Sequence, residues 1–207
     1  MTFPTRTLQE LLAVCHFLSD FPGRWWLGGG WAIDAWLGRQ TREHEDIEIC
    51  VFRADQPAIY ACCPDWQYFT PVDNEWAPIP TGTLLVAPQS MLQLQRTPAT
   101  TITIPDLPPT FEFLLNDTTN GEWIQHDEPE VRLPLNSIYG DTPLGIPAAI
   151  PELVLLHKAW TVERAKDDHD FQQIHKQLRA GQRAWLTNHI VRTRPQHRWL
   201  PILEAEQ

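Results

Sequence analysis

Residues 27–52 read LGGGWAIDAWLGRQTREHEDIEICVF, and they combine three consecutive glycines with carboxylates that alternate with isoleucine. The segment RWWLG at 24–28 has the composition of a short strand that runs into the glycines. Residues 31–37 are predicted to form a short helix, which Gly38 ends. Residues 46–52 again have strand composition. The stretch therefore predicts a strand, a glycine turn, a helix and a second strand in succession.

The three glycines, Gly28, Gly29 and Gly30, lie directly before the predicted helix. A glycine turn at a helix N-terminus exposes backbone N–H groups with no side chains in the way, which suits a phosphate or another anion. A tight turn that needs positive φ is the simpler explanation, and the glycines alone favour it. Their spacing matches neither the dinucleotide fingerprint nor the P-loop.

The acidic pair Asp46 and Glu48 changes that balance. On a strand both carboxylates project from one face, while Ile47 and Ile49 project from the other. Neighbouring carboxylates repel each other, and oxygen ligands at this spacing favour Mg²⁺, which binds a few carboxylates together with substrate phosphates. The alternative is an edge strand with a solvated acidic face. The glycine turn directly upstream favours the metal, because it would place a phosphate cradle beside it.

The composition is that of a globular protein with an acidic surface. The chain has 207 residues, of which 43% are hydrophobic, so it suits one domain or a domain with a small appendage. Sixteen basic and 26 acidic residues give a formal net charge of −10, which disfavours binding to nucleic acid or to a membrane and permits cationic small molecules and metal ions.

The four cysteines show no CxxC spacing, and no segment approaches the roughly twenty apolar residues of a membrane span. We therefore expect a cytoplasmic protein with reduced thiols.

Prolines divide the chain into regions of different secondary structure. Fifteen of the nineteen lie between Pro57 and Pro151, so this region is expected to hold strands and loops and no long helices. The strands expected there are 66–69, 83–87, 110–116, 122–126 and 130–134. Helices are expected at 7–20, where Thr7 and Glu10 fit a capping box, at 55–63, and in the tail from 147. The order of elements predicts an α/β core at 1–146 and a helical subdomain at 147–207.

The segment GGGWAIDAWLGRQTREHEDIEI resembles the signature of the nucleotidyltransferase superfamily, whose fold is shared with DNA polymerase β. More narrowly, it is similar to the aminoglycoside 2″-nucleotidyltransferase group and its uncharacterised relatives. The segments FEFLLNDTTNGEWI, GIPAAIPELVLLHKAW and RAKDDHDFQQI extend the resemblance, which runs from about residue 8 to 200. It implies an α+β fold, in which helices flank a mixed sheet and a helical subdomain follows.

The resemblance also implies roles for individual residues. The nucleotide-binding residues would be Gly28, Gly29, Gly30, Arg42, His44 and Lys158. The catalytic and metal-binding acids would be Asp46, Glu48 and Glu112. Simpler interpretations exist for three of these: a loop arginine, a solvated histidine and a surface lysine. Asp34, on the helix after the glycines, is expected to brace the motif and not to bind metal.

Two positions depart from the pattern of the aminoglycoside enzymes. Glu48 stands where they have aspartate, and its longer side chain would shift the ion. Thr110 stands where the active enzymes have a third aspartate. Glu112 follows two residues later and therefore shares the strand face with Thr110, so it is the candidate to replace the missing acid, either as third ligand or as base.

The function that follows is a Mg²⁺-dependent, adenylyltransferase-like enzyme. It would move a nucleoside monophosphate from ATP or GTP to a hydroxyl of a small acceptor, and the acidic surface fits a cationic, aminoglycoside-like compound. Two alternatives stay open: a catalytically impaired nucleotide- or ligand-binding protein, which Thr110 favours, and a toxin–antitoxin component that modifies a protein hydroxyl. The absence of a basic stripe disfavours a nucleic-acid polymerase. The oligomeric state is left open.

Overall fold

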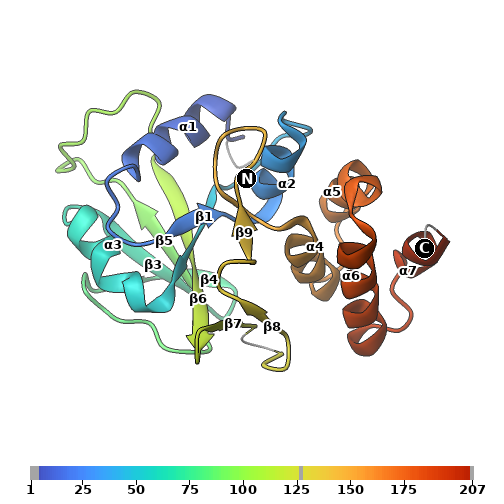
Figure 1. The fold of residues 1–207 in the computed structure, drawn as a ribbon. Coiled ribbons are helices and arrows are strands. Elements are labelled where there is room, and N and C mark those ends of the chain that lie inside the picture. Colours follow the sequence, from blue (N-terminus) through green and yellow to red (C-terminus); the bar gives the residue numbers. More distant parts are fainter. Residues whose placement is uncertain (1–4, 126–127, 206–207) are drawn as a thin grey trace.

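A mixed sheet organises the fold of the computed structural model, which describes residues 5–125 and 128–205 (Figure 1). The sheet order is β4-β3-β5-β6-β2-β1-β10-β9, and β7 and β8 continue from the far end of β6. The strands are β1 Trp25–Leu27, β2 Glu48–Phe52, β3 Gln67–Val72, β4 Glu75–Ile79, β5 Met91–Gln95, β6 Thr110–Thr119, β7 Glu122–Ile124, β8 Arg132–Pro134, β9 Tyr139–Gly140 and β10 Ala148–Ala149.

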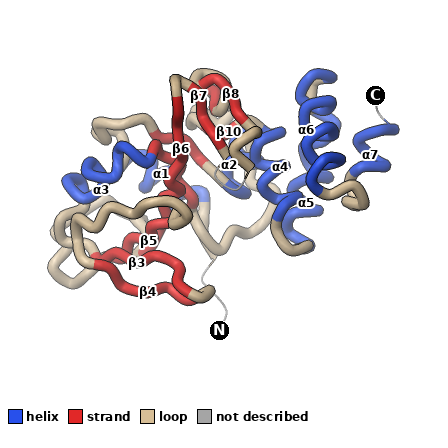
Figure 2. Tube along the Cα trace, turned by 90° about the horizontal axis from the view of Figure 1, so that it is seen from below, coloured by secondary structure: helices blue, strands red, loops and turns tan. Residues whose placement is uncertain are grey.

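The helices lie on both sides of this sheet and beyond one end of it. They are α1 Leu8–Phe17, α2 Gly29–Leu37, α3 Gln56–Cys62, α4 Pro151–Trp160, α5 Ala165–Ile174, α6 Ala180–Thr193 and α7 Leu200–Ala205. Figure 2 shows α4 to α7 gathered at one end of the molecule, away from β3 and β4. Helix α2 lies between the sheet and this group and contacts both α4 and α5. The expected α+β fold with a mixed sheet is confirmed.

The pairing at the centre of the sheet decides which side chains share a face. Strands β2 and β6 are parallel and in register, with Glu48 opposite Glu112, whereas β5 runs antiparallel to β6 on its other side. Phe111 and Phe113 are buried on the face that α1 covers, where Phe17 lies 6.1 Å from Phe111 between ring centroids. Glu112 therefore points to the opposite face.

Local sequence signals place several element ends as predicted. The capping box of Thr7 and Glu10 opens α1, and Gly38 ends α2 in the left-handed conformation with a φ of 69°. Helix α2 begins at Gly29, two residues earlier than predicted, and β2 begins at Glu48, two residues later. Asp46 consequently lies just before its strand and not on it.

The strand predicted at 83–87 is wrong. This segment is a loop, and the buried side chain of Gln56 satisfies its backbone: Leu85 donates to Gln56 Oε1 over 2.7 Å, and Gln56 Nε2 donates to the Leu85 carbonyl over 2.9 Å. Strands β4 and β5 were not predicted. The strand expected at 122–126 is β7, and its predicted last residue, His126, lies outside the described residues.

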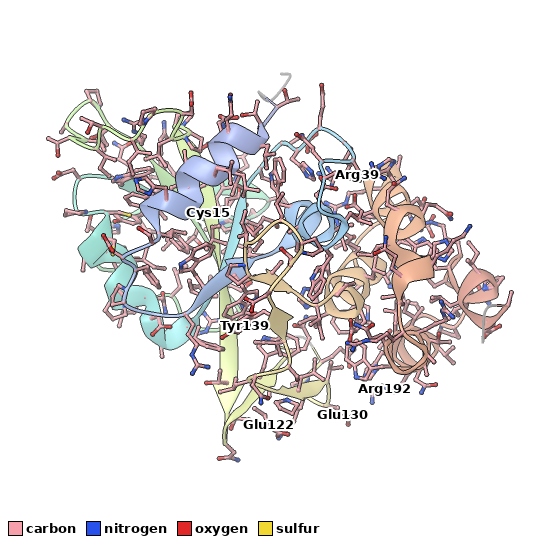
Figure 3. All side chains as sticks on the ribbon, turned by 45° about the horizontal axis from the view of Figure 1, so that its top comes forward. Cys15, Arg39, Glu122, Glu130, Tyr139 and Arg192 are labelled. Atoms are coloured by element: carbon pink, nitrogen blue, oxygen red, sulfur yellow. The ribbon has the colours of Figure 1, made fainter. Side chains whose placement is uncertain are left out.

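Residues beyond 146 contact the rest of the chain through a strand of the sheet and through an ion pair. Strand β10 pairs with β1 and β9, so the sheet includes residues beyond 146, and the division into two domains stays a prediction. An ion pair of 3.0 Å between Arg192 of α6 and Glu130 links the tail to the loop before β8 (Figure 3). Both side chains are exposed, so this pair contributes little stability. Within the described ranges, no helix combines the length and apolar composition of a membrane span.

Candidate active site

The candidate site begins with a cluster of three acids at the start of β2 and β6. Glu48 and Glu112 are register partners on the same face, and the Glu112 amide donates to the Ile47 carbonyl over 2.9 Å. Asp46 precedes them, and its carbonyl accepts a hydrogen bond of 3.1 Å from the Trp31 indole. These contacts hold three carboxylates on two neighbouring backbone segments.

Burial and crowding raise the pKa values of two of these acids. Burial, followed by the charges of Asp46 and Glu112, raises the pKa of Glu48 to about 8. Burial and the charge of Asp46 raise the pKa of Glu112 to about 7, although Gln93 Nε2 donates to Glu112 Oε1 over 3.2 Å. Among the described residues, the carboxylates of Asp46 and Glu48 have no hydrogen bond or ion pair to a cationic side chain. Lys158 and Lys166 lower the pKa of Glu48, but burial and the neighbouring acids outweigh them.

The glycine turn packs directly against this cluster. Gly28 caps α2, and its amide donates to the Glu48 carbonyl over 2.9 Å. Gly29 has a φ of +53°, and a Cβ there would lie 1.5 Å from Glu48 Oε2. A Cβ on Gly30 would lie 2.1 Å from a terminal guanidinium nitrogen of Arg42. The turn thus needs glycine both for its backbone conformation and for the close approach of these side chains.

Arg42 and His44 lie behind Gly30 and are paired with buried acids. Arg42 makes two hydrogen bonds to Asp170, of 2.7 and 2.9 Å, and Asp170 is fully buried. His44 Nε2 lies 2.6 Å from Asp34 Oδ2, and the imidazole stacks on Trp31 with 4.1 Å between ring centroids. His44 is therefore buried and not solvated, and Asp34 braces the motif as expected. The nucleotide contacts implied for Arg42 and His44 stay predictions.

Lys158 is not a surface lysine, because its side chain is only 8% exposed. Its ammonium lies 3.0 Å from Asp167 and 2.9 Å from Asp170, so it shares the second acid with Arg42. Arg164 also binds Asp167, over 2.7 Å. Burial opposes the ionised form of Asp170, yet Arg42 and Lys158 hold its pKa below the ordinary value. This network ties the glycine turn to helices α4 and α5.

A cleft of about 420 Å³ opens beside the acids and the glycine turn. Its lining includes Gly28, Gly29, Glu48 and Lys158 of the predicted site. Four further kinds of side chain were not predicted: tryptophans, a histidine, amides and a second cation. They include Trp26, Trp123, Trp160, His157, Asn116, Gln125 and Arg164. Their positions depend on pairing between distant strands and helices, so no local sequence signal marks them.

Comparison with known proteins agrees with this fold. Residues 10–79 match the family model described as aminoglycoside-2″-adenylyltransferase. The crystal structure of ANT(2″)-Ia in complex with adenylyl-2″-tobramycin superimposes with a TM-score of 0.57 at 16% identity, covering 90% of this chain and 99% of that one. The crystal structure of the lincosamide antibiotic adenylyltransferase LnuA, lincomycin-bound, gives 0.56 at 20% identity, covering 83% and 98%. This chain has the nucleotidyltransferase fold.

Curated relatives match over shorter segments. The 2″-aminoglycoside nucleotidyltransferase of Escherichia coli is 71% identical over 24 residues, which are 12% of this chain and 14% of that protein. The lincosamide resistance protein of Staphylococcus haemolyticus is 40% identical over 43 residues, or 21% and 27%. The matched segments thus span about a seventh and about a quarter of these relatives. These matches agree with the predicted resemblance to the nucleotidyltransferase superfamily.

In this chain with the nucleotidyltransferase fold, an arginine side chain binds Thr110, the residue that stands in place of the third aspartate. Arg6 Nη2 donates to the Thr110 hydroxyl over 2.6 Å, and the Arg6 amide donates to the His44 carbonyl over 2.6 Å. The Arg6 side chain is 6% exposed and also pairs with Glu10 at 3.3 Å. Sequence reasoning missed Arg6, because a lone arginine before a helix gives no local signal.

The donor set of the acid cluster fits a hard divalent cation. Its groups are carboxylates. Burial, followed by the charges of the neighbouring acids, raises the pKa values of Glu48 and Glu112, and a cation would offset the negative charge. Within residues 5–125 and 128–205, however, no group of three or more His, Cys, Asp or Glu side chains is arranged to hold a metal ion. Mg²⁺ is commonly bound by one or two carboxylates plus substrate phosphates. A ligand set of Asp46, Glu48 and Glu112 stays a prediction.

Proposed function

We propose that the protein is a Mg²⁺-dependent nucleotidyltransferase that moves a nucleoside monophosphate from ATP or GTP to a hydroxyl of a small acceptor. The observation that carries this proposal is the packing of Gly29 against the Glu48 carboxylate. A phosphate-sized anion at the helix N-terminus would lie next to the acids, where a divalent cation would bind both. The names of the relatives, which describe transfer to aminoglycoside and lincosamide antibiotics, support an antibiotic hydroxyl as acceptor.

Asp46 and Glu48 are the residues that would hold the metal, with Glu112 beside them. Bound Mg²⁺ would offset the charge of the acids and of the triphosphate. The amides of the glycine turn would fix the outer phosphates. Lys158 and Arg164 line the same cleft and would steer the triphosphate to it. Arg42, which Asp170 orients, would keep the turn in place from behind.

In the proposed reaction, the acceptor oxygen forms a bond to the α-phosphorus while the bond from that phosphorus to the bridging oxygen breaks. Pyrophosphate leaves, and the hydroxyl proton passes to a base. We assign Glu112 as this base, because it shares the face of Glu48 and no cationic side chain among the described residues pairs with it. Thr110, two residues earlier on the same strand, is not an acid and therefore offers no second carboxylate there.

The test is incubation with labelled ATP or GTP, Mg²⁺ and a panel of aminoglycosides, lincosamides and simple alcohols. We expect pyrophosphate and a nucleotidylated product, and we expect neither without the metal. Asp46→Asn should abolish the product, whereas Asp20→Asn, an exposed aspartate outside the cleft, should leave it unchanged. If no triphosphate yields pyrophosphate with any acceptor, the proposal is wrong.

The pairing of Thr110 with Arg6 favours a second candidate, a nucleotide-binding protein without turnover. Two variants separate the candidates. In an active enzyme, Glu112→Gln loses most activity while nucleotide still binds, and Thr110→Asp is tolerated. In a binding protein, the natural chain shows no turnover and only Thr110→Asp produces any.

A further inference from the structure

The floor of the cleft runs along two neighbouring strands, away from the acids. Glu48 and Glu112 are register partners at the start of β2 and β6. Cys50 and Leu114 form the next pair on the same face, and Asn116 follows on β6 about 13 Å beyond the level of the glutamates. The cleft lining includes Glu48, Cys50, Leu114 and Asn116. The cleft therefore extends from the acids at one end to Asn116 at the other.

Lys158 lies at the acid end, because a series of contacts joins it to the glycine turn. Its ammonium lies 2.9 Å from Asp170, which also binds Arg42 over 2.7 Å. A Cβ on Gly30 would lie 2.1 Å from the Arg42 guanidinium. The proposed function gives the turn and Lys158 to the triphosphate. A nucleoside bonded to these phosphates extends from there, and the cleft continues toward Asn116.

Three aromatic side chains, His157, Trp160 and Trp123, form an aromatic wall in the cleft. The His157 ring lies 6.1 Å from Trp123 and 6.0 Å from Trp160 between centroids. Trp123 is almost fully buried, whereas His157 and Trp160 are half-buried and have surface left for a ligand. His157 directly precedes Lys158 on α4, so a nucleotide with its phosphates at Lys158 has its base within reach of the wall.

Hydrogen bonds at the indole nitrogens orient both tryptophans of the aromatic wall. Trp123 donates to Asn116 Oδ1 over 2.8 Å, and Trp160 donates to the Thr193 hydroxyl over 2.9 Å. The rings are thus held in place before a ligand binds, which reduces the entropy lost on binding. Stacking of a base on an aromatic side chain increases affinity by about five- to hundredfold.

The amides beside the aromatic wall are engaged within the protein. Asn116 accepts the Trp123 hydrogen bond and donates one of 2.9 Å to the Leu114 carbonyl. Gln125 Oε1 lies 3.2 Å from His157 Nε2. A site that hydrogen-bonds a ligand edge discriminates strongly between related ligands, whereas stacking tolerates every base because each has a π face. This wall therefore favours stacking over readout of the base edge.

We propose that the nucleobase of the triphosphate stacks on the aromatic wall, with His157 and Trp160 as the residues that contact it, and that the site accepts adenine and guanine with little discrimination. This inference rests on the proposed nucleotidyl transfer and deepens it, because it assigns residues to the base that the phosphate-binding groups do not reach.

The experiment measures dissociation constants by calorimetry for MgATP, MgGTP and magnesium tripolyphosphate, which has the phosphates without the nucleoside. The two nucleotides should bind within about tenfold of each other, and both about tenfold or more tighter than tripolyphosphate. Equal affinity for MgATP and tripolyphosphate overturns the inference. A larger difference between MgATP and MgGTP overturns the stated tolerance, because it requires readout of the base edge.

Variants of His157 separate the base from the ribose. His157→Leu removes the ring, so affinity for both nucleotides should fall about tenfold, while His157→Phe keeps a ring and should retain it. Trp160→Leu should act like His157→Leu. Tripolyphosphate should bind all three variants as it binds the natural chain, which also shows that they fold. Equal losses in His157→Leu and His157→Phe, or a parallel loss of tripolyphosphate binding, contradict stacking.

His189→Leu is the matched control. His189 is also a half-buried histidine next to a tryptophan, with its ring 4.2 Å from Trp185 between centroids, but it lies on α6 outside the cleft lining. The substitution should leave all three affinities unchanged. A loss of nucleotide affinity equal to that of His157→Leu would show that the effect does not arise in the cleft.

Two results separate failure of this inference from failure of the proposed function. If neither MgATP nor magnesium tripolyphosphate binds, the proposed function itself fails. If both bind and pyrophosphate forms, but His157→Leu changes only the KM of the hydroxyl acceptor, the aromatic wall serves the acceptor. In that case the proposed function stands and only the assignment of the base fails.

Discussion

The contact between Gly29 and Glu48 can be measured through Gly29→Ala. The residue has a φ of +53°, and an added Cβ would lie 1.5 Å from Glu48 Oε2 and 2.8 Å from Glu48 Cδ. Atoms that are not bonded to each other do not approach this closely, so the Glu48 carboxylate must move. The substitution therefore combines two separate costs, one from the backbone and one from the displaced acid.

The two costs have different physical origins and can be estimated separately. A Cβ in the left-handed region costs about 1–2 kcal/mol. Overpacking that forces a neighbouring side chain aside costs about 1–3 kcal/mol more. Gly29→Ala should thus lower the free energy of unfolding by about 2–5 kcal/mol. Nucleotidyl transfer should be lost as well, since the Glu48 carboxylate leaves its position.

Gly145→Ala is the matched control. Gly145 also has a positive φ, +76°, but nothing lies within 4 Å of a Cβ built there. It should show the backbone cost alone, about 1–2 kcal/mol, in urea unfolding at neutral pH. The difference between the two variants is the cost of displacing Glu48.

A double-mutant cycle identifies the partner. Adding Glu48→Ala to Gly29→Ala removes the displaced carboxylate, so stability should recover by about 1–3 kcal/mol relative to the sum of the single changes. Additive effects, or equal costs for Gly29→Ala and Gly145→Ala, would show that the turn does not pack on Glu48. The link between phosphate cradle and acid would then be refuted.

Three further predictions concern the acids and their ligands. Asp46→Asn should abolish transfer, while the unfolding free energy of the ligand-free protein stays level or rises, because repulsion among the acids is relieved. Glu48 holds its proton to about pH 8 in the folded state and only to its ordinary pKa of 4.5 when unfolded, so the folded state binds more protons between these values. Unfolding free energy should therefore fall as the pH rises from 4.5 to 8, and urea titrations should show a shallower fall in Glu48→Gln. ATP or GTP at about a hundred times its dissociation constant, with Mg²⁺, should stabilise the fold by about 2.7 kcal/mol in thermal unfolding. Either component alone should do much less, and no shift with both would contradict nucleotide binding.

Local signals were enough for the parts of the fold that local physics decides. The capping box at Thr7, the left-handed Gly38 and the strand before the glycines each depend on a few neighbouring residues. The strand predicted at 83–87 failed because a distant side chain, Gln56, takes the backbone hydrogen bonds that a neighbouring strand would supply. Apolar composition alone does not distinguish these two partners.

The site, too, was predictable from the sequence only where neighbouring residues decide the geometry. Alternation predicted that Asp46 and Glu48 share one strand face and that Glu112 shares one with Thr110, and the parallel register of β2 and β6 brings the two glutamates opposite each other. The partners that set their environment come from far along the chain. Asp170 binds Arg42 across 128 residues, and Arg6 binds Thr110 across 104. No spacing rule reports contacts of this kind.

Arg6, which binds Thr110, neutralises the acid cluster only in part. Arg6 is close enough to lower the pKa of Glu112, yet its guanidinium is bound to the Thr110 hydroxyl and to Glu10. Its effect is smaller than those of burial and Asp46, so the pKa of Glu112 remains raised. The lysines near Glu48 likewise leave its pKa well above 4.5. Because the cationic side chains among the described residues do not neutralise the acids, a bound cation is the group best suited to do so, and loss of the third aspartate does not remove that need.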